Sequence, residues 1–151
     1  MATRIDTEII IAASPALVWQ VLTDWQAYPQ WNPFILSLDG QLACGQRLQV
    51  TIQPPGGNSM VFRPTVVSHQ PGSHFAWLGR VGLPGLFDGR HAFTLQPMPD
   101  GTTRLLHGEQ FSGLLTLLLS TSQQRQIQQG FITMNEALAA RCKMLASTRP
   151  D

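Results

Sequence analysis

The sequence has little charge and no run of like charges. Charged residues make up 13% of the 151 residues, roughly half the usual share, and the net charge is +1. The arginines stand singly, which argues against a nucleic-acid-binding surface and against a polybasic segment for anionic lipid. A surface with so little charge is either tolerated or partly covered by a partner, so a homodimer is one of two possibilities.

Cysteines and long apolar runs are also scarce. Cys44 and Cys142 belong to no CxxC or Cys/His cluster, so we expect no metal site, and nothing indicates a cofactor. The longest apolar run, 114–119, is interrupted by Thr116 and is far shorter than the ~20 residues of a membrane span. The first residues do not resemble a signal peptide. We therefore expect a cytoplasmic protein with reduced thiols and no membrane insertion.

Common catalytic motifs are missing. No serine lies in a G-x-S-x-G motif, and the glycine-rich segment 79–89 lacks the GK[ST] of a P-loop. His107-Gly-Glu109 matches the H-x-E of zinc deaminases, but no P-C-x-x-C follows it. Segment 79–89 is expected to be either a cavity lid or an ordinary hairpin connection.

A long amphipathic helix is predicted over about residues 123–146. Its apolar residues recur every three or four positions, which puts them on one side of the helix: Ile127, Phe131, Met134, Leu138, Cys142 and Leu145. Gly130 lies inside this pattern, where glycine is less favourable than alanine. A close contact with the sheet or a bend in the helix would explain it, and so would a substitution without structural consequence. A helix of this length needs a broad apolar surface to cover.

The rest of the chain reads mainly as antiparallel strands. Residues 3–11 predict a strand, and Ser14 before Pro15 predicts the start of a short helix. Segment 25–34 has four aromatic residues and two prolines, and is expected to be an irregular packed corner after a second short helical turn that ends at Pro29. About six more strands follow, with Pro64 marking an edge or a bulge. The fold class is α+β: a curved antiparallel sheet of six to seven strands around the long helix, in one domain over 1–151.

Motifs along nearly the whole chain resemble the polyketide cyclase/dehydrase-like branch of the START/Bet v 1 superfamily, also called SRPBCC. The resemblance implies the helix-grip fold with a deep apolar cavity, and no single activity. The segments that carry it are Ala13-Ser14-Pro15, Val18-Trp19, Leu22-Thr23-Asp24, YPQWNPF at 28–34, Gly40, Gly45, Trp77-Leu78-Gly79, GRHAF at 89–93, Thr103-Arg104-Leu105, His107, Glu109, Phe111, Gly113, Asn135 and Leu138.

One predicted hairpin holds the candidate chemistry. If Leu95 faces Leu105 across a turn at 97–103, His91 faces Glu109 and His107 lies on the same inward face. These three side chains could anchor a polar group of a ligand, transfer a proton, or form a satisfied buried cluster that fixes the strand register.

The leading hypothesis is a carrier or sensor that binds a small hydrophobic molecule, such as a lipid, a polyketide-like or an aromatic compound. The alternatives are a cyclase or dehydratase that uses His91, His107 and Glu109, and a protein-interaction module. Segment 114–122 would cover a cavity mouth or form a dimer patch. The side chains expected to line the ligand site are Trp31, Phe62, Trp77, His91, Phe93, His107, Glu109, Phe111, Phe131 and Met134.

Overall fold

The computed structural model describes residues 3–83 and 85–148. The predicted α+β class is confirmed. The elements are β1 (Thr3–Ile11), α1 (Pro15–Thr23), the 3₁₀ helix η1 (Trp25–Ala27), α2 (Tyr28–Trp31), β2 (Ile35–Asp39), β3 (Gln49–Ile52), β4 (Met60–Phe62), β5 (Thr65–Gln70), β6 (His74–Val81), β7 (Phe87–Pro97), β8 (Thr103–Ser112), the 3₁₀ helix η2 (Leu114–Leu118) and α3 (Thr121–Thr148).

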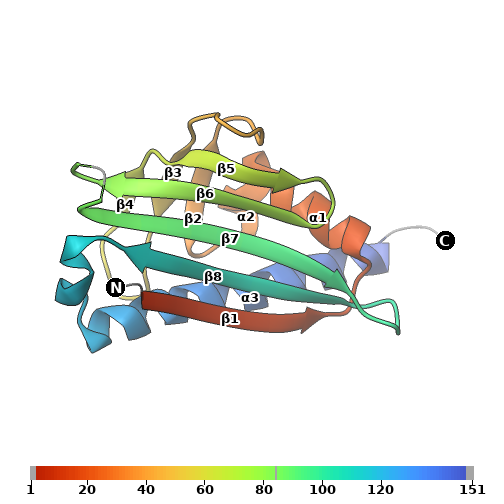
Figure 1. The fold of residues 1–151 in the computed structure, drawn as a ribbon. Helices are drawn as coiled ribbons and strands as arrows, with labels where there is room; N and C mark the ends of the chain where they lie inside the picture. Colours follow the sequence, from red (N-terminus) through yellow and green to blue (C-terminus); the bar gives the residue numbers. More distant parts are fainter. Residues whose placement is uncertain (1–2, 84, 149–151) are drawn as a thin grey trace.

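The strands form two antiparallel sheets around α3. One has the order β1-β8-β7-β6-β5 and the other β2-β3-β4, so the described residues contain eight strands rather than six to seven. Backbone hydrogen bonds from Leu48 to Pro64 and from Val66 to Gln46 join the two sheets into one curved wall. In Figure 1, α3 runs along one face of the larger sheet, and its main strand contact is with β1.

Pro64 lies where the chain passes from one sheet to the other. Pro64 was predicted to mark an edge or a bulge of a strand, but β4 ends at Phe62 and β5 begins at Thr65. Proline cannot donate to a strand ladder, so the chain leaves β4 before this residue. The strand interruption was anticipated, whereas the change of sheet was not.

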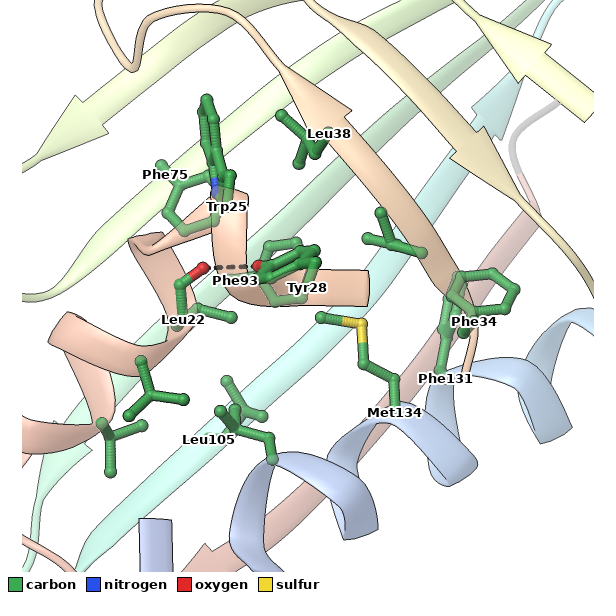
Figure 2. Close-up of a cluster of buried hydrophobic side chains, with 14 of the residues drawn as sticks. Leu22, Trp25, Tyr28, Phe34, Leu38, Phe75, Phe93, Leu105, Phe131 and Met134 are labelled. Carbon is green, nitrogen blue, oxygen red and sulfur yellow. Dashed lines mark hydrogen bonds between the residues drawn. The ribbon is translucent and has the colours of Figure 1, made fainter. Parts of the chain in front are cut away.

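Residues 15–31 form helices at one end of the core. The Ser14 side chain accepts a hydrogen bond from the Leu17 amide, as its place before Pro15 predicted. The prediction that the next turn ends at Pro29 was wrong, because Pro29 lies in the first turn of α2, where its missing N–H costs nothing. Tyr28 is fully buried and its hydroxyl donates to the Leu22 carbonyl (Figure 2).

Gly130 allows α3 to pack closely against the start of β2. A Cβ at this position would lie 2.5 Å from the ring of Phe34, far inside van der Waals contact. Phe34 in turn meets Phe131 edge-to-face, with ring centroids 5.6 Å apart (Figure 2). Of the three explanations left open for Gly130, the close contact is therefore the one that is present. The described helices include none that is long and apolar enough to cross a bilayer.

Candidate functional site

An apolar cavity of about 230 Å³ lies between the two sheets and α3. Its buried walls include Phe34, Val50 and Trp77, whereas Met60 and Val81 are about half exposed and mark the mouth. The remaining lining residues are Ile52, Pro54, Phe62, Pro64, Gly79, Arg80, Phe87, Gly89, His91, Glu109, Phe111, Leu119 and Ile127. A larger hollow lies on the outer face of the five-stranded sheet, and its lining includes the ion pairs Arg4–Asp6 and Arg104–Glu8.

Half of the residues predicted to line a ligand site border this cavity. They are Phe62, Trp77, His91, Glu109 and Phe111. The other five lie elsewhere: Phe93, His107, Phe131 and Met134 are fully buried in the packed core, and Trp31 lies beside α1 and the end of α3. Beyond the cavity the interior is filled by the packed core, which includes Leu22, Trp25 and Tyr28 from the helical corner at 15–31.

The strand register places the candidate residues as the sequence predicted. Leu95 pairs with Leu105, Phe93 with His107, and His91 with Glu109. All point to the inner face of β7 and β8, toward α3. The segment 79–89 is mostly strand, so it forms the β6–β7 hairpin rather than a long loop.

A chain of hydrogen bonds connects the two histidines to α3 and β1. His91 Nε2 lies 2.7 Å from His107 Nε2, and His107 Nδ1 lies 2.7 Å from Asn135 Oδ1. Asn135 Nδ2 donates to Thr7 Oγ1 over 2.8 Å, and the Thr7 hydroxyl donates to the His107 carbonyl over 2.7 Å. The chain thus runs from β7 through β8 and α3 to the edge strand β1.

This chain determines where the protons lie. The single Thr7 hydroxyl proton is used on a carbonyl, so Thr7 accepts from Asn135, and the amide oxygen of Asn135 must face His107. His107 therefore carries its proton on Nδ1, and its Nε2 accepts from His91 Nε2–H. The remaining nitrogen of His91, Nδ1, points toward Glu109.

His107 is held neutral. It is 1% exposed and lies between the rings of Phe93 and Phe131, with centroids 4.3 and 4.4 Å away. Burial lowers the pKa of His107 well below the ordinary histidine value, and the neighbouring His91 lowers it further, against the opposing effect of the Asn135 hydrogen bond. A neutral ring is what the single-donor arrangement requires.

The free energy of unfolding is expected to fall as the pH is lowered from 7 to 5. Below about 6.5 the unfolded chain protonates residue 107 while the folded chain does not, so acid favours unfolding by up to about 1.4 kcal/mol per pH unit. His74, whose pKa is also lowered by partial burial, has the same sign, so denaturation should be followed in a His74→Gln background. Adding His107→Gln should reduce the slope of the free energy of unfolding against pH. Equal slopes in the two proteins would contradict the assignment.

Glu109 brings a polar group to the cavity wall. Its side chain is 18% exposed, and Oε1 lies 3.6 Å from His91 Nδ1. Gly89 makes room for this carboxyl group, because a Cβ there would lie 2.7 Å from Oε2. The carboxyl group can meet a hydroxyl or carbonyl group of a ligand at this wall.

Several site residues were not predicted. Thr7 faces inward by strand alternation, but its sequence context resembles any half-buried strand position. Asn135 entered only through the family resemblance, although a polar residue on the apolar side of α3, between Met134 and Leu138, was a usable signal. Gly89, Met60 and the β3 residues of the lining depend on how the two sheets meet, which local patterns do not encode.

Comparisons with known proteins agree with this architecture. The family model for polyketide cyclase/dehydrase and lipid transport matches residues 2–138. The search among curated proteins gave no match. A START superfamily protein from Mycobacterium smegmatis is 21% identical, with a TM-score of 0.74 and coverage of 94% of this chain and 98% of its own.

Two aromatase/cyclase structures share the fold. The Zhui aromatase/cyclase from Streptomyces sp. R1128 is 14% identical, with a TM-score of 0.71 and coverage of 97% of this chain and 96% of its own. The di-domain StfQ of steffimycin biosynthesis is 12% identical, with a TM-score of 0.76 and coverage of 98% of this chain and 53% of its own. At these identities the likeness shows the fold alone. The match over residues 2–138, together with the helix-grip architecture, places the chain in the polyketide cyclase/dehydrase and lipid transport family.

Proposed function

We propose that the protein binds a small apolar molecule with one hydroxyl or carbonyl group in the cavity between the sheets, and acts as a carrier or sensor. The observation that carries the proposal is the lining: aromatic and aliphatic side chains enclose the space, and the Glu109 carboxyl group next to His91 is the polar group at its buried side. Ligand sites commonly combine an apolar wall with a few converging polar groups.

The size of the cavity limits the ligand. Its volume of about 230 Å³ lies below the range of about 300–1,000 Å³ usual for drug-sized ligands. A compact aromatic or short-chain compound fits this volume better than a long lipid. Trp77 and Phe111 offer flat apolar surfaces in the same lining as Glu109.

Catalysis of the cyclase type is the second candidate, and the His91–Glu109 contact favours it. A carboxyl group and an imidazole nitrogen 3.6 Å apart beside a cavity can pass a proton to or from a bound compound. His107 cannot take part directly, because both of its nitrogens are engaged in hydrogen bonds within the core. Glu109 is then the group that would contact the reacting molecule.

Filling the cavity should abolish binding of an apolar probe. Ile127 lies on the cavity side of α3, so Ile127→Trp would occupy the space, and we expect at least a tenfold loss of affinity for anilinonaphthalene sulfonate in a fluorescence titration, about 1.4 kcal/mol. Gln128→Trp places the same side chain on the exposed side of the helix and serves as the matched control. Equal affinity of both variants would contradict the proposed site.

Glu109→Gln separates binding from turnover. For a carrier or sensor, native mass spectrometry should find a copurified ligand on the wild type, and Glu109→Gln should weaken its retention. For an enzyme, the same variant should keep the bound compound but stop its conversion. A wild type without any bound compound and without probe binding would contradict both candidates.

A further inference from the structure

Another pocket, which we call the α1–α3 pocket, lies toward the other end of α3 from the cavity. Its volume is about 200 Å³, and it is bordered by α1, by the corner that contains Asp24 and Trp31, and by the last turns of α3. Figure 1 shows α1 beside the end of α3, and the two helices pack against each other. The pocket and the cavity share no lining residue. At a rise of about 1.5 Å per residue, Ile127 in the cavity wall and Arg141 in the pocket are about 21 Å apart along α3.

The buried side of the α1–α3 pocket is apolar. Leu17 and Val21 lie one helical turn apart on α1, and each is 5% exposed. The half-buried side chains of Leu145 and Trp31 complete this wall from α3 and α2. Trp31 also packs edge-to-face on the buried ring of Tyr28, with ring centroids 5.1 Å apart, so its position is fixed. A small aliphatic group in the pocket would therefore contact apolar atoms from three helices.

A carboxylate and a guanidinium group line the same pocket from different elements. Asp24 is exposed and caps the C-terminus of α1, whereas Arg141 is half-buried on α3. Within the described part of the chain, neither side chain belongs to an ion pair. Arg141 Nη2 donates a hydrogen bond to Gln30 Oε1 over 3.0 Å, which orients the guanidinium group. The pocket thus combines an apolar wall with one positive and one negative group that do not neutralise each other.

We propose that the α1–α3 pocket binds a free α-amino acid with an aliphatic side chain, such as leucine. The ammonium group meets Asp24 beside the last carbonyl groups of α1, where a helix C-terminus favours a cation. The carboxylate meets Arg141, because a planar guanidinium group suits a carboxylate. The aliphatic side chain lies on Leu17 and Val21.

The charges and the volume of the pocket select this class of ligand. A compound with a single charge would leave either Asp24 or Arg141 without a partner. The volume of about 200 Å³ lies below the range of about 300–1,000 Å³ usual for drug-sized ligands, so a single amino acid suits the pocket better than a peptide. The inference goes beyond the proposed function, because it concerns another class of ligand at a separate place in the fold.

Three related compounds test the two charges separately. L-Leucine has both charged groups, 3-methylbutylamine lacks the carboxylate, and 4-methylpentanoate lacks the ammonium group. In an NMR titration of the wild type, followed on the amides of α1 and the last turns of α3, we expect L-leucine to bind at least about tenfold more tightly than either analogue. Equal affinity of the three compounds, or no binding of L-leucine at millimolar concentration, would overturn the proposal. So would leucine-induced shifts that are confined to residues around the cavity.

Two variants should respond differently to these compounds. Asp24→Asn should weaken L-leucine binding about tenfold and leave 4-methylpentanoate unchanged, whereas Arg141→Gln should weaken both acids and leave 3-methylbutylamine unchanged. Because Asp24 is exposed, its substitution should not affect folding. The matched controls are Asp39→Asn and Lys143→Gln, which remove exposed charges from β2 and α3 outside the pocket lining and should leave all three affinities unchanged. Binding of L-leucine to Asp24→Asn with wild-type affinity would contradict the assigned site.

Discussion

Phe131→Ala is expected to lower the free energy of unfolding by about 3–5 kcal/mol, measured by urea denaturation at neutral pH. Phe131 is fully buried and touches both histidines as well as Phe34, with ring centroids 4.4 Å from His107, 5.0 Å from His91 and 5.6 Å from Phe34. Truncation would leave a void among rings that belong to two strands, β7 and β8, and to the corner before β2. These elements cannot all move to fill it.

Phe87→Ala is the control for this variant. Phe87 is half-buried in the cavity wall and already borders empty space, so its loss should cost clearly less, roughly 1–2 kcal/mol. If the two variants lose the same amount, Phe131 is not the packing centre that the structure indicates. If Phe131→Ala costs under about 1 kcal/mol, the core around the histidines is loosely packed and the separation of core from cavity is wrong.

The β7–β8 hairpin could be predicted from sequence because two local signals agree. The turn segment 97–103 contains Pro97, Pro99 and Gly101, and alternation on both sides of it allows one register that buries Leu95, Leu105 and Phe93 together. A shift by one residue would expose all of them. The pairing of His91 with Glu109 followed from that register without any further information.

The division of the strands into two sheets could not be predicted in the same way. Met60, Phe62 and Val66 keep a period of two across Pro64, so their pattern resembles one interrupted strand. Whether the chain continues in one sheet or changes to another depends on its partners, here residues 45–48, which are distant in sequence. The cavity lies where the sheets diverge, and therefore most of its lining was also missed.

The proton arrangement of the site depends on side-chain directions that a register does not give. His91 and His107 are diagonal neighbours rather than partners across the ladder, and they meet because both rings turn toward each other. The sequence placed His91, His107 and Glu109 on one inward face and left open whether they anchor a ligand, transfer a proton or form a satisfied buried cluster. In the structure His107 lies in the core, His91 between core and cavity, and Glu109 in the cavity wall.

Asn135→Leu is expected to lower the free energy of unfolding by about 2–4 kcal/mol, because it leaves buried polar groups unpaired. With Nδ1 protonated, His107 would keep a donor without an acceptor. With Nε2 protonated instead, it would bond to His91 but leave a bare Nδ1 in an apolar core. Neither tautomer repairs the loss, and Thr7 also loses its donor. Glu136→Leu, one position further on the exposed side of α3, should change stability by less than about 0.5 kcal/mol.

Nitrogen NMR of the imidazole rings would distinguish this network from simple packing. In the wild type, His107 should carry its proton on Nδ1. In Asn135→Leu, we expect it on Nε2, which obliges His91 Nε2 to accept and puts a proton on His91 Nδ1, facing Glu109. An unchanged tautomer with a stability loss below about 1 kcal/mol would mean that Asn135 does not set the proton order. If the tautomer does reverse, a residue on α3 determines which polar atoms the cavity offers a ligand, although it does not border the cavity itself.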